Sequence, residues 1–255
     1  MKYFKLIGIM SLLVFSFYLT DFVTELAINS NPLMQSIKNN SKNYTCTGVN
    51  ATIKNNTIIP GIKGKKINEM ESFLNMKDFG AFNANYLIYD YFKPEISISD
   101  NKDKIIISGN KNLRQISILL KSNMDILNFV KENNIKYSKL VTIDSTLDYE
   151  ENINIENIKE NFVNLNTLLN KKDLNKKICI LNYSNIEKCK ELKYFIVKPS
   201  INLNNTNFLY SINNLSNGDI ILIDDNFSLE NFKIFINKIN NKDLNFVYLS
   251  KIIEE

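Results

Sequence analysis

The chain has 255 residues, of which 44% are hydrophobic, enough for one sizeable core with accessory elements. Its net charge is +4, and its 31 basic and 27 acidic residues are interspersed, so the composition does not indicate nucleic-acid binding. The chain contains no histidine and no C-x-x-C pair, which argues against a cysteine-based metal site, and we expect no cofactor.

The N-terminal segment predicts a membrane anchor. Residues 6–20 carry no charge, Lys2 and Lys5 precede this run, and Asp21 follows it. Basic residues before an apolar run place the N-terminus in the cytoplasm and the rest of the chain outside. An uncleaved signal anchor over residues 1–28 is favoured over a cleaved signal peptide, because no small-x-small cleavage site follows. We therefore expect a single-pass cell-membrane protein that contacts the membrane through residues 6–28 and has an extracellular C-terminal domain.

The next segments predict a juxtamembrane helix and linker over residues 29–43 and a small extracellular α+β module over residues 44–111. Asn31 and Pro32 indicate a helix start, and residues 39–43 read as a polar linker. The expected apolar face of this helix is Leu33, Met34 and Ile37. Within the module, strands are expected at 49–53, 58–59, 86–92 and 105–107. A helix capped by Asn68 and ended by Gly80 should bury Met70, Phe73, Leu74 and Met76.

Residues 112–145 predict one strand–helix–strand unit. The run at 116–120 is long enough for a buried strand and too short for a helix. Apolar residues recur at helical spacing from Met124 to Val130, and a second strand-like run spans 137–143. A strand, a crossover helix and another strand form a right-handed parallel unit.

The same alternation continues to the end of the chain. Helices are expected at 155–169, 186–192, 209–215 and 229–239, with a short helix beginning at 252. Further strands are expected at 178–181, 194–197, 219–223 and 246–249, which gives six strands after residue 112. An open doubly wound sheet and an incomplete barrel fit this pattern equally well.

The three cysteines leave their pairing open. Cys179 is expected on a strand and Cys189 on the following helix, whereas Cys46 lies far from both in sequence. A disulfide between Cys179 and Cys189 is feasible outside the cell, but the sequence does not give the geometry that it requires. Small buried thiols are the favoured interpretation.

Polar residues that follow the predicted strands form a candidate ligand-binding cleft, because the carboxyl ends of parallel strands share one edge. These residues are Lys121, Asp144, Asn182, Lys198, Asp224 and Asp225. Such a cleft suits an anionic or hydroxyl-rich ligand. The favoured alternative is that loops after strands are simply polar. Asp224 and Asp225 are a weak signal for a hard cation, and we assign no catalytic or metal-binding residue.

Several segments resemble the polysaccharide deacetylase family of the NodB-homology type, in its membrane-anchored branch from low-GC Gram-positive bacteria. The leader motifs are Ile59-Pro-Gly-Ile-Lys-Gly, Ser72-x-x-x-Met76-Lys, Phe92-Lys-Pro-x-Ile-Ser97 and Ile107-Ser-Gly-Asn110. The later motifs are Ile116-Ser-Ile-Leu-Leu, Ile178-Cys179-Ile with Cys189, Ile196-Val-Lys198-Pro199-Ser200, Gly218-Asp-Ile-Ile and Phe246-Val-x-Leu-Ser250. The likeness spans nearly the whole chain.

The resemblance implies an α/β fold: a degenerate, incomplete (β/α) barrel of the NodB type over residues 112–255, preceded by the small α+β module and the N-terminal membrane helix. It also implies that active members hold a divalent metal with one aspartate and two histidines and use a second aspartate as base. Here the first-strand aspartate positions read Lys121-Ser122, and the segment from Asp144 to Tyr149 has no histidine. No functional residue of active members can therefore be transferred to this chain.

Two classes of function remain. The first is a catalytically inactive, deacetylase-like protein that binds cell-wall glycan or a membrane or wall protein partner. The second is an active carbohydrate N-deacetylase, a hydrolase of carbon–nitrogen bonds other than peptide bonds, with an atypical aspartate-based metal site. The absence of histidine from the sequence favours the first class.

Overall fold

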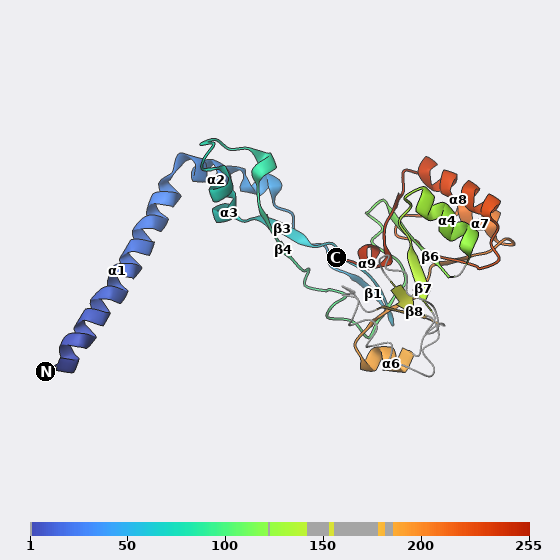
Figure 1. Cartoon of the computed structure of the whole chain (residues 1–255), viewed down its shortest axis with the longest axis horizontal. Helices are drawn as coiled ribbons and strands as arrows, with labels where there is room; N and C mark the ends of the chain where they lie inside the picture. The colour runs from blue at the N-terminus through green and yellow to red at the C-terminus, as the bar shows by residue number, and fades with distance from the viewer. Residues whose placement is uncertain (1, 122, 142–152, 156–177, 182–185) are drawn as a thin grey trace. The chain divides into compact units, whose positions relative to one another are not determined.

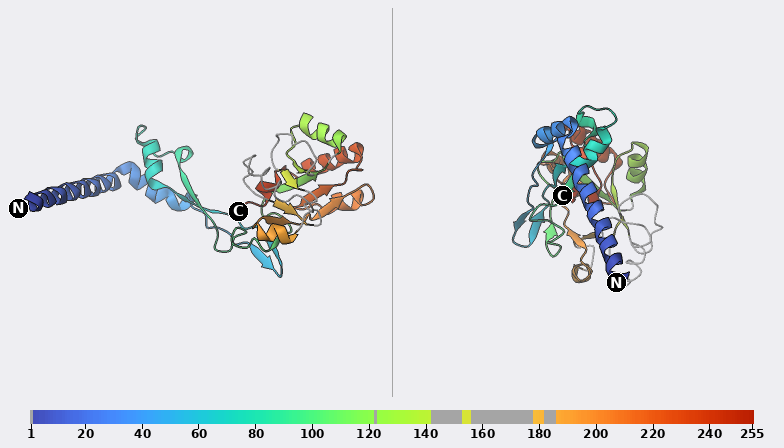
Figure 2. Two further views of the ribbon diagram at one scale, coloured as in Figure 1. Left: turned by 60° about the horizontal axis from the view of Figure 1, so that its bottom comes forward. Right: turned by 90° about the vertical axis from the view of Figure 1, so that its left-hand side faces the viewer.

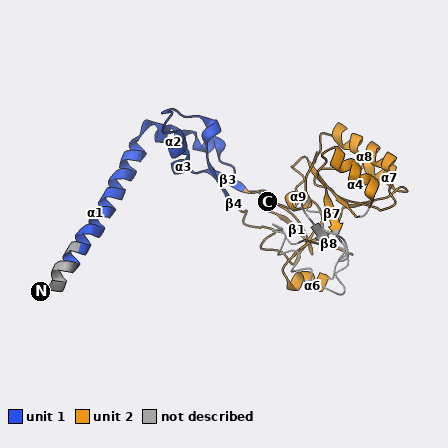
Figure 3. Ribbon diagram, in the orientation of Figure 1, with its two compact units in different colours: residues 1–47, 64–92 blue, residues 48–63, 93–255 orange. Residues whose placement is uncertain are grey.

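The computed structural model describes residues 2–121, 123–141, 153–155, 178–181 and 186–255 (Figure 1). These residues form two units, one of residues 1–47 and 64–92 and one of residues 48–63 and 93–255 (Figure 3). This division differs from the predicted boundaries at 44–111 and 112–255. Residues 48–63 and 93–111 belong to the second unit because their strands join its sheet.

The first unit begins with α1 (Lys2–Ser30), whose side chains are largely exposed. Within it, Met10–Ser30 is apolar and long enough to cross a membrane, since its 21 residues span about 32 Å against a hydrocarbon core of about 30 Å. An apolar helix at this position is either a membrane anchor or a signal sequence.

Helix α2 (Pro32–Tyr44) starts as predicted, because the Asn31 side chain accepts a hydrogen bond from the Leu33 N–H. Its predicted apolar face of Leu33, Met34 and Ile37 is buried. The predicted linker at 39–43 is wrong, since the helix continues through it. This extra turn brings Tyr44 onto the core of the unit.

The rest of the first unit is the antiparallel pair β3 (Gly64–Ile67) and β4 (Tyr89–Phe92), the helix α3 (Glu69–Met76) and the 3₁₀ turn η1 (Ala84–Tyr86). Asn68 caps α3 as predicted, accepting from the Glu71 N–H. Phe73 and Met76 are buried. Met70 and Leu74 are exposed instead of buried, and α3 ends at Met76, before Gly80. The expected strand at 86–92 is shorter, because η1 takes up its first residue.

In the part of the chain that the structure describes, the second unit is built on an eleven-stranded sheet with the order β1-β2-β5-β10-β9-β8-β7-β6-β12-β11, in which β13 also pairs with β6. The pairing is parallel except between β1 and β2. The strands are β1 (Thr52–Lys54), β2 (Thr57–Ile59), β5 (Ile105–Ile106), β6 (Gln115–Leu120), β7 (Ser138–Val141), β8 (Ile153–Ile155), β9 (Ile178–Ile180), β10 (Phe195–Val197), β11 (Ile201–Leu203), β12 (Ile220–Ile223) and β13 (Asn245–Phe246).

Strand β6 is the centre of this unit and has a core on each face. The predicted strand–helix–strand unit is confirmed: β6, α4 (Met124–Glu132) and β7 follow one another, and β6 and β7 pair in parallel. Ile116, Ile118 and Leu120 pack under α4, α7 (Phe208–Asn213) and α8 (Leu229–Asn241). Helix α4 lies beside α8 in Figure 2. Leu119 faces the second core, which α9 (Leu249–Ile252) helps to fill.

Two strands of this unit were not predicted. Strand β8 includes Ile155, which the sequence placed at the start of a helix over 155–169; the remainder of that helix lies outside the described residues. Strand β11 is three residues long and pairs with β12 alone. The last strand is shorter than predicted, since Leu249 begins α9.

Cys179 on β9 and Cys189 on α6 (Ile186–Glu191) form a disulfide, with Cα atoms 6.4 Å apart. The favoured interpretation as buried thiols is therefore wrong, although both residues are buried as expected. Helix α6 starts soon after β9 and returns Cys189 to the strand, which satisfies the distance that a disulfide needs. Cys46 is a free, exposed thiol.

Two glycines from different motifs meet at the amino end of β12. The Gly109 N–H donates to the Gly218 carbonyl at 2.7 Å, and Gly218 has φ +81°. A Cβ on Gly218 would lie 2.5 Å from the Gly109 oxygen. Two short segments that carried the resemblance are therefore in direct backbone contact.

We expect Gly218→Ala to lower the free energy of unfolding by about 1–3 kcal/mol, since it adds backbone strain and forces the two chain segments apart. Gly80→Ala is the matched control, because Gly80 has φ +68° and open space around its Cα. Denaturant titration, in which the unfolding of each unit is followed separately, measures the change in the free energy of unfolding for both variants. Equal losses would show that the contact with Gly109 contributes nothing.

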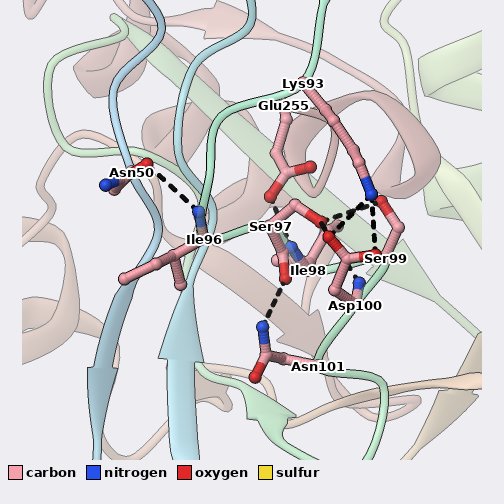
Figure 4. A network of polar contacts seen from close by, with 9 residues as sticks. All are labelled: Asn50, Lys93, Ile96, Ser97, Ile98, Ser99, Asp100, Asn101 and Glu255. Atoms are coloured by element: carbon pink, nitrogen blue, oxygen red, sulfur yellow. Dashed lines mark hydrogen bonds and ion pairs between the residues drawn. The ribbon is translucent and has the colours of Figure 1, made fainter.

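A polar network fixes the segment that follows β4 in the sequence (Figure 4). The Lys93 ammonium lies 2.7 Å from the Asp100 carboxylate, which also accepts from the Ser97 hydroxyl at 2.8 Å. The Ile98 N–H donates to the side-chain carboxylate of Glu255. The last residue of the sequence is thereby bound to this segment of the second unit.

Glu254 beside this network gives a prediction about acid stability. Its carboxylate lies 3.0 Å from the Lys63 ammonium and 2.8 Å from that of Lys251. Partial burial raises its pKa, but the hydrogen bonds and charges of the two lysines outweigh burial and lower the pKa from 4.5 to about 2. A lowered pKa in the folded state stabilises the fold above pH 4.5, and this contribution is lost as the pH falls toward 2.

We therefore expect Glu254→Gln to lower the melting temperature at pH 7, and the difference from the wild type to shrink between pH 4.5 and 2. Because the ion pairs are partly exposed, the loss at pH 7 should be only about 1 kcal/mol. Thermal melts across this pH range measure the effect, with Glu95→Gln as an exposed control. A difference that does not change with pH would contradict the assignment.

Candidate ligand-binding cleft

The candidate cleft lies where β6 and β12 end. These strands are parallel neighbours in the register Ser117↔Ile220 to Leu119↔Leu222, so Lys121 and Asp224 follow at the same edge of the sheet. The ends of these two strands therefore lie side by side, and ligand binding there stays a prediction.

Lys121 and Asp225 form the charged centre of the cleft. The Lys121 ammonium lies 4.0 Å from the Asp225 carboxylate, and the Lys121 side chain is only 19% exposed. Asp225 is more open to solvent. The strand end therefore presents a cation that belongs to the chain itself, paired with a carboxylate from the neighbouring loop.

Hydrogen bonds hold the loop after β12 in place. The Asn123 side-chain amide donates to the carbonyls of Asp225 at 2.8 Å and Phe227 at 3.0 Å, which ties the loop to the start of α4. The Asp224 carboxylate accepts from the Asn226 N–H at 3.0 Å, closing a local turn. One carboxylate oxygen of Asp224 therefore stabilises the conformation of the loop, and the residue is exposed to solvent.

The loop after β11 continues this surface. The Asn205 amide donates to the Asn226 carbonyl at 2.8 Å and accepts from the Ser228 N–H at 3.1 Å. Sequence reasoning missed Asn123 and Asn205. Asn123 directly precedes the predicted helix, and asparagine is a typical helix-capping residue, so its position in the sequence could have identified it. Asn205 follows a strand that was not predicted, and no pattern in the sequence pointed to it.

The other predicted cleft residues are not brought to this centre by the described residues. Lys198 is exposed and follows β10, and β9, β8 and β7 separate β10 from β6 in the sheet. The backbone N–H of Lys198 donates a hydrogen bond to the Ile106 carbonyl on β5. Asp144 and Asn182 lie outside the described residues.

The donor set at this edge does not fit a divalent cation. A hard cation needs several oxygen ligands, and a lysine ammonium repels it. Lys121 already places one positive charge beside Asp225. Among the described residues, no three of the His, Cys, Asp and Glu side chains gather as metal ligands would.

Two hollows lie at the opposite end of the parallel strands, near the start of β7. One of about 370 Å³ is lined by residues that include Tyr137 and Tyr248, and one of about 460 Å³ by residues that include Phe129 and Phe246. The residues that line these two hollows include none of the predicted cleft residues.

No protein-family model matches the chain. Solved structures nevertheless show that the chain shares the fold of CE4 family proteins, the NodB-type (β/α) barrel that the sequence predicted in a degenerate form. In the described residues the strand path runs from β1 to β11, in agreement with an incomplete barrel.

The chain is similar to BA3943 from Bacillus anthracis, described as a CE4 family pseudoenzyme. The wild-type structure has a TM-score of 0.53 and 15% identity, covering 88% of this chain and 95% of BA3943. A BA3943 mutant, described as having restored enzymatic activity, has a TM-score of 0.52 and 14% identity over 88% and 98% of the two chains. At this identity the likeness shows the fold alone.

The chain is also similar in sequence to the uncharacterized protein YlxY of Bacillus subtilis (strain 168). The two are 30% identical over 101 residues, which is 39% of this chain and 31% of YlxY. The match therefore spans about a third of that relative's length.

Proposed function

We propose that this chain is a membrane-anchored, extracellular deacetylase-like protein that is catalytically inactive and binds cell-wall glycan at the strand-end cleft. One observation carries the proposal: the side chain of Lys121, at the end of β6, is mostly buried, and its ammonium lies 4.0 Å from the Asp225 carboxylate. The resemblance places a metal-binding carboxylate of active members at that strand end. A lysine ammonium at that position supports a role in binding a ligand and not in activating a water molecule for hydrolysis.

The polar groups of the cleft suit an acidic, hydroxylated sugar. Lys121 offers an ammonium to a carboxylate, and the exposed oxygens of Asp224 and Asp225 accept from hydroxyl groups. A glycan whose units carry a lactyl carboxylate fits this set better than a neutral one. A protein partner is the alternative occupant.

Isothermal titration calorimetry tests this binding. The full chain in nanodiscs is titrated with soluble peptidoglycan fragments and with neutral chitooligosaccharides of matched length. We expect Lys121→Met to weaken fragment binding by at least about tenfold, the loss of one charge-assisted contact, and Lys198→Met to leave it unchanged. An equal effect of both variants, or no binding by the wild type, would reject the glycan proposal.

The contacts of Asn29 support the uncleaved anchor. The Lys38 ammonium lies 2.8 Å from the Asn29 side-chain oxygen, and the Gln35 amide donates to the Asn29 carbonyl at 2.6 Å. Ile28 packs against the core of the first unit. The outer end of α1 is therefore part of a folded unit that cleavage near residue 28 would damage.

The anchor and its orientation are tested in cells. A C-terminal reporter that is active only outside the cytoplasm should give signal, and intact-mass analysis of membrane-extracted protein should retain residues 1–28. A reporter active only in the cytoplasm would contradict the orientation, and a mature chain that lacks α1 would contradict the anchor.

A further inference from the structure

Helix α3 has apolar side chains on two faces. Phe73 and Met76 enter the core of the first unit, whereas Met70 and Leu74, one turn apart, are 39% and 43% exposed. A helix that buries one apolar stripe is expected to be polar on the other side. Met70 and Leu74 therefore leave apolar surface exposed on the outer side of α3.

The exposed apolar surface continues beyond the helix. Phe79 is 65% exposed, and its ring centroid lies 5.0 Å from that of Tyr86. The Asn75 amide donates to the Tyr86 carbonyl at 2.9 Å and holds η1 against α3. We call Met70, Leu74, Phe79 and Tyr86 the α3 patch.

The α3 patch belongs to the same unit as the apolar helix α1. Ile28, near the outer end of α1, packs on the core that contains Phe73 and Met76 of α3. The core of the first unit therefore joins α3 to the outer end of α1. The headgroup layer, about 5–8 Å thick, begins where α1 leaves the hydrocarbon core, so the first unit starts at that layer.

We propose that the α3 patch rests in the headgroup layer of the bilayer that α1 spans, as a second membrane contact of the first unit. This inference depends on the proposed membrane anchor. A lipid surface is the occupant because the patch lies in the same unit as the apolar helix α1 and carries Phe and Tyr rings, which favour the interface. Lys77, exposed one turn beyond Leu74, can reach lipid phosphates.

Single-tryptophan fluorescence in nanodiscs tests the proposal, because the chain has no tryptophan of its own. Three full-length variants are compared with brominated and ordinary lipids: Phe79→Trp in the patch, Phe15→Trp in α1, and Tyr210→Trp in the second unit, where Tyr210 is 76% exposed. We expect brominated lipid to quench the Phe79→Trp emission, because apolar rings that lie in the interface reach the headgroup/acyl boundary. The Tyr210→Trp emission should not change.

The variants separate the two proposals. Quenching of Phe15→Trp without quenching of Phe79→Trp would overturn the second membrane contact and leave the anchor intact. Absence of quenching at Phe15→Trp would overturn the anchor, and the patch proposal with it. Equal quenching of Phe79→Trp and Tyr210→Trp would indicate unspecific adsorption and would also overturn the proposal.

Discussion

The purified full chain is expected to release no acetate above background from N-acetylated chitooligosaccharides or peptidoglycan, even with zinc, cobalt or manganese added. Amide hydrolysis near pH 7 needs an activated nucleophile, stabilisation of the oxyanion and an acid for the leaving amine. The resemblance assigns these tasks to a metal, an aspartate and a histidine. The chain has no histidine, and Lys121 stands at the first-strand position.

The size of the expected loss follows from these roles. Acid–base catalysis alone contributes about 10²–10⁴-fold, and a metal adds several kcal/mol of transition-state stabilisation. Losing both leaves no measurable rate. Metal-dependent acetate release that disappears in the Asp224→Ala, Asp225→Ala double variant would reject the inactive assignment and support the aspartate-based hydrolase.

Lys121→Asp provides a sharper form of this test. Removing the ammonium and adding a carboxylate beside Asp225 should raise the affinity of the chain for divalent cations, measured by calorimetry. Acetate release should nevertheless remain at background, because no histidine supplies the proton transfers. Lys198→Asp, which adds a carboxylate away from this centre, is the control for unspecific metal binding.

Loss of the disulfide between Cys179 and Cys189 is expected to be the largest stability effect among the predictions. The cysteines are 10 residues apart in sequence, and a loop of that size stabilises the fold by about 3 kcal/mol through the entropy of the unfolded chain. For a unit of this size the loss corresponds to about 6–12 °C in melting temperature.

Cys189→Ser and reduction of the wild type should give the same lowered melting temperature, because both leave β9 and α6 without their covalent link. Cys46→Ser should melt like the wild type, since Cys46 is free and exposed. Differential scanning calorimetry with and without reductant measures all three. An unchanged melting temperature on reduction would show that the link contributes nothing to the fold.

The sequence predicts best what local patterns determine. The run at 116–120 and the helical spacing after Met124 are sufficient for β6, α4 and β7. Asn31 and Asn68 have the side chain that caps a helix, and both do so. In these places, local preference and tertiary structure agree.

Features that depend on contacts between residues far apart in the sequence could not be predicted from local patterns. Strand β11 exists because it pairs with β12, and three residues give no periodicity by themselves. The exposure of Met70 and Leu74 depends on which face of α3 the rest of the unit covers. In the cleft, Lys121 and Asp225 lie together because the ends of neighbouring parallel strands adjoin. Lys198 follows a strand that is not next to theirs, and no local pattern encodes strand order.

The sheet order also determines when the fold can be completed during synthesis. Strand β5 pairs with β2, which precedes it in the sequence, on one side and with β10, about 90 residues later, on the other. At about 5–20 residues per second, the β10 edge of β5 has no partner for roughly 5–20 s after β5 is made. An unpaired apolar edge invites pairing with other chains, so the β10 edge of β5 is an aggregation hazard during this interval.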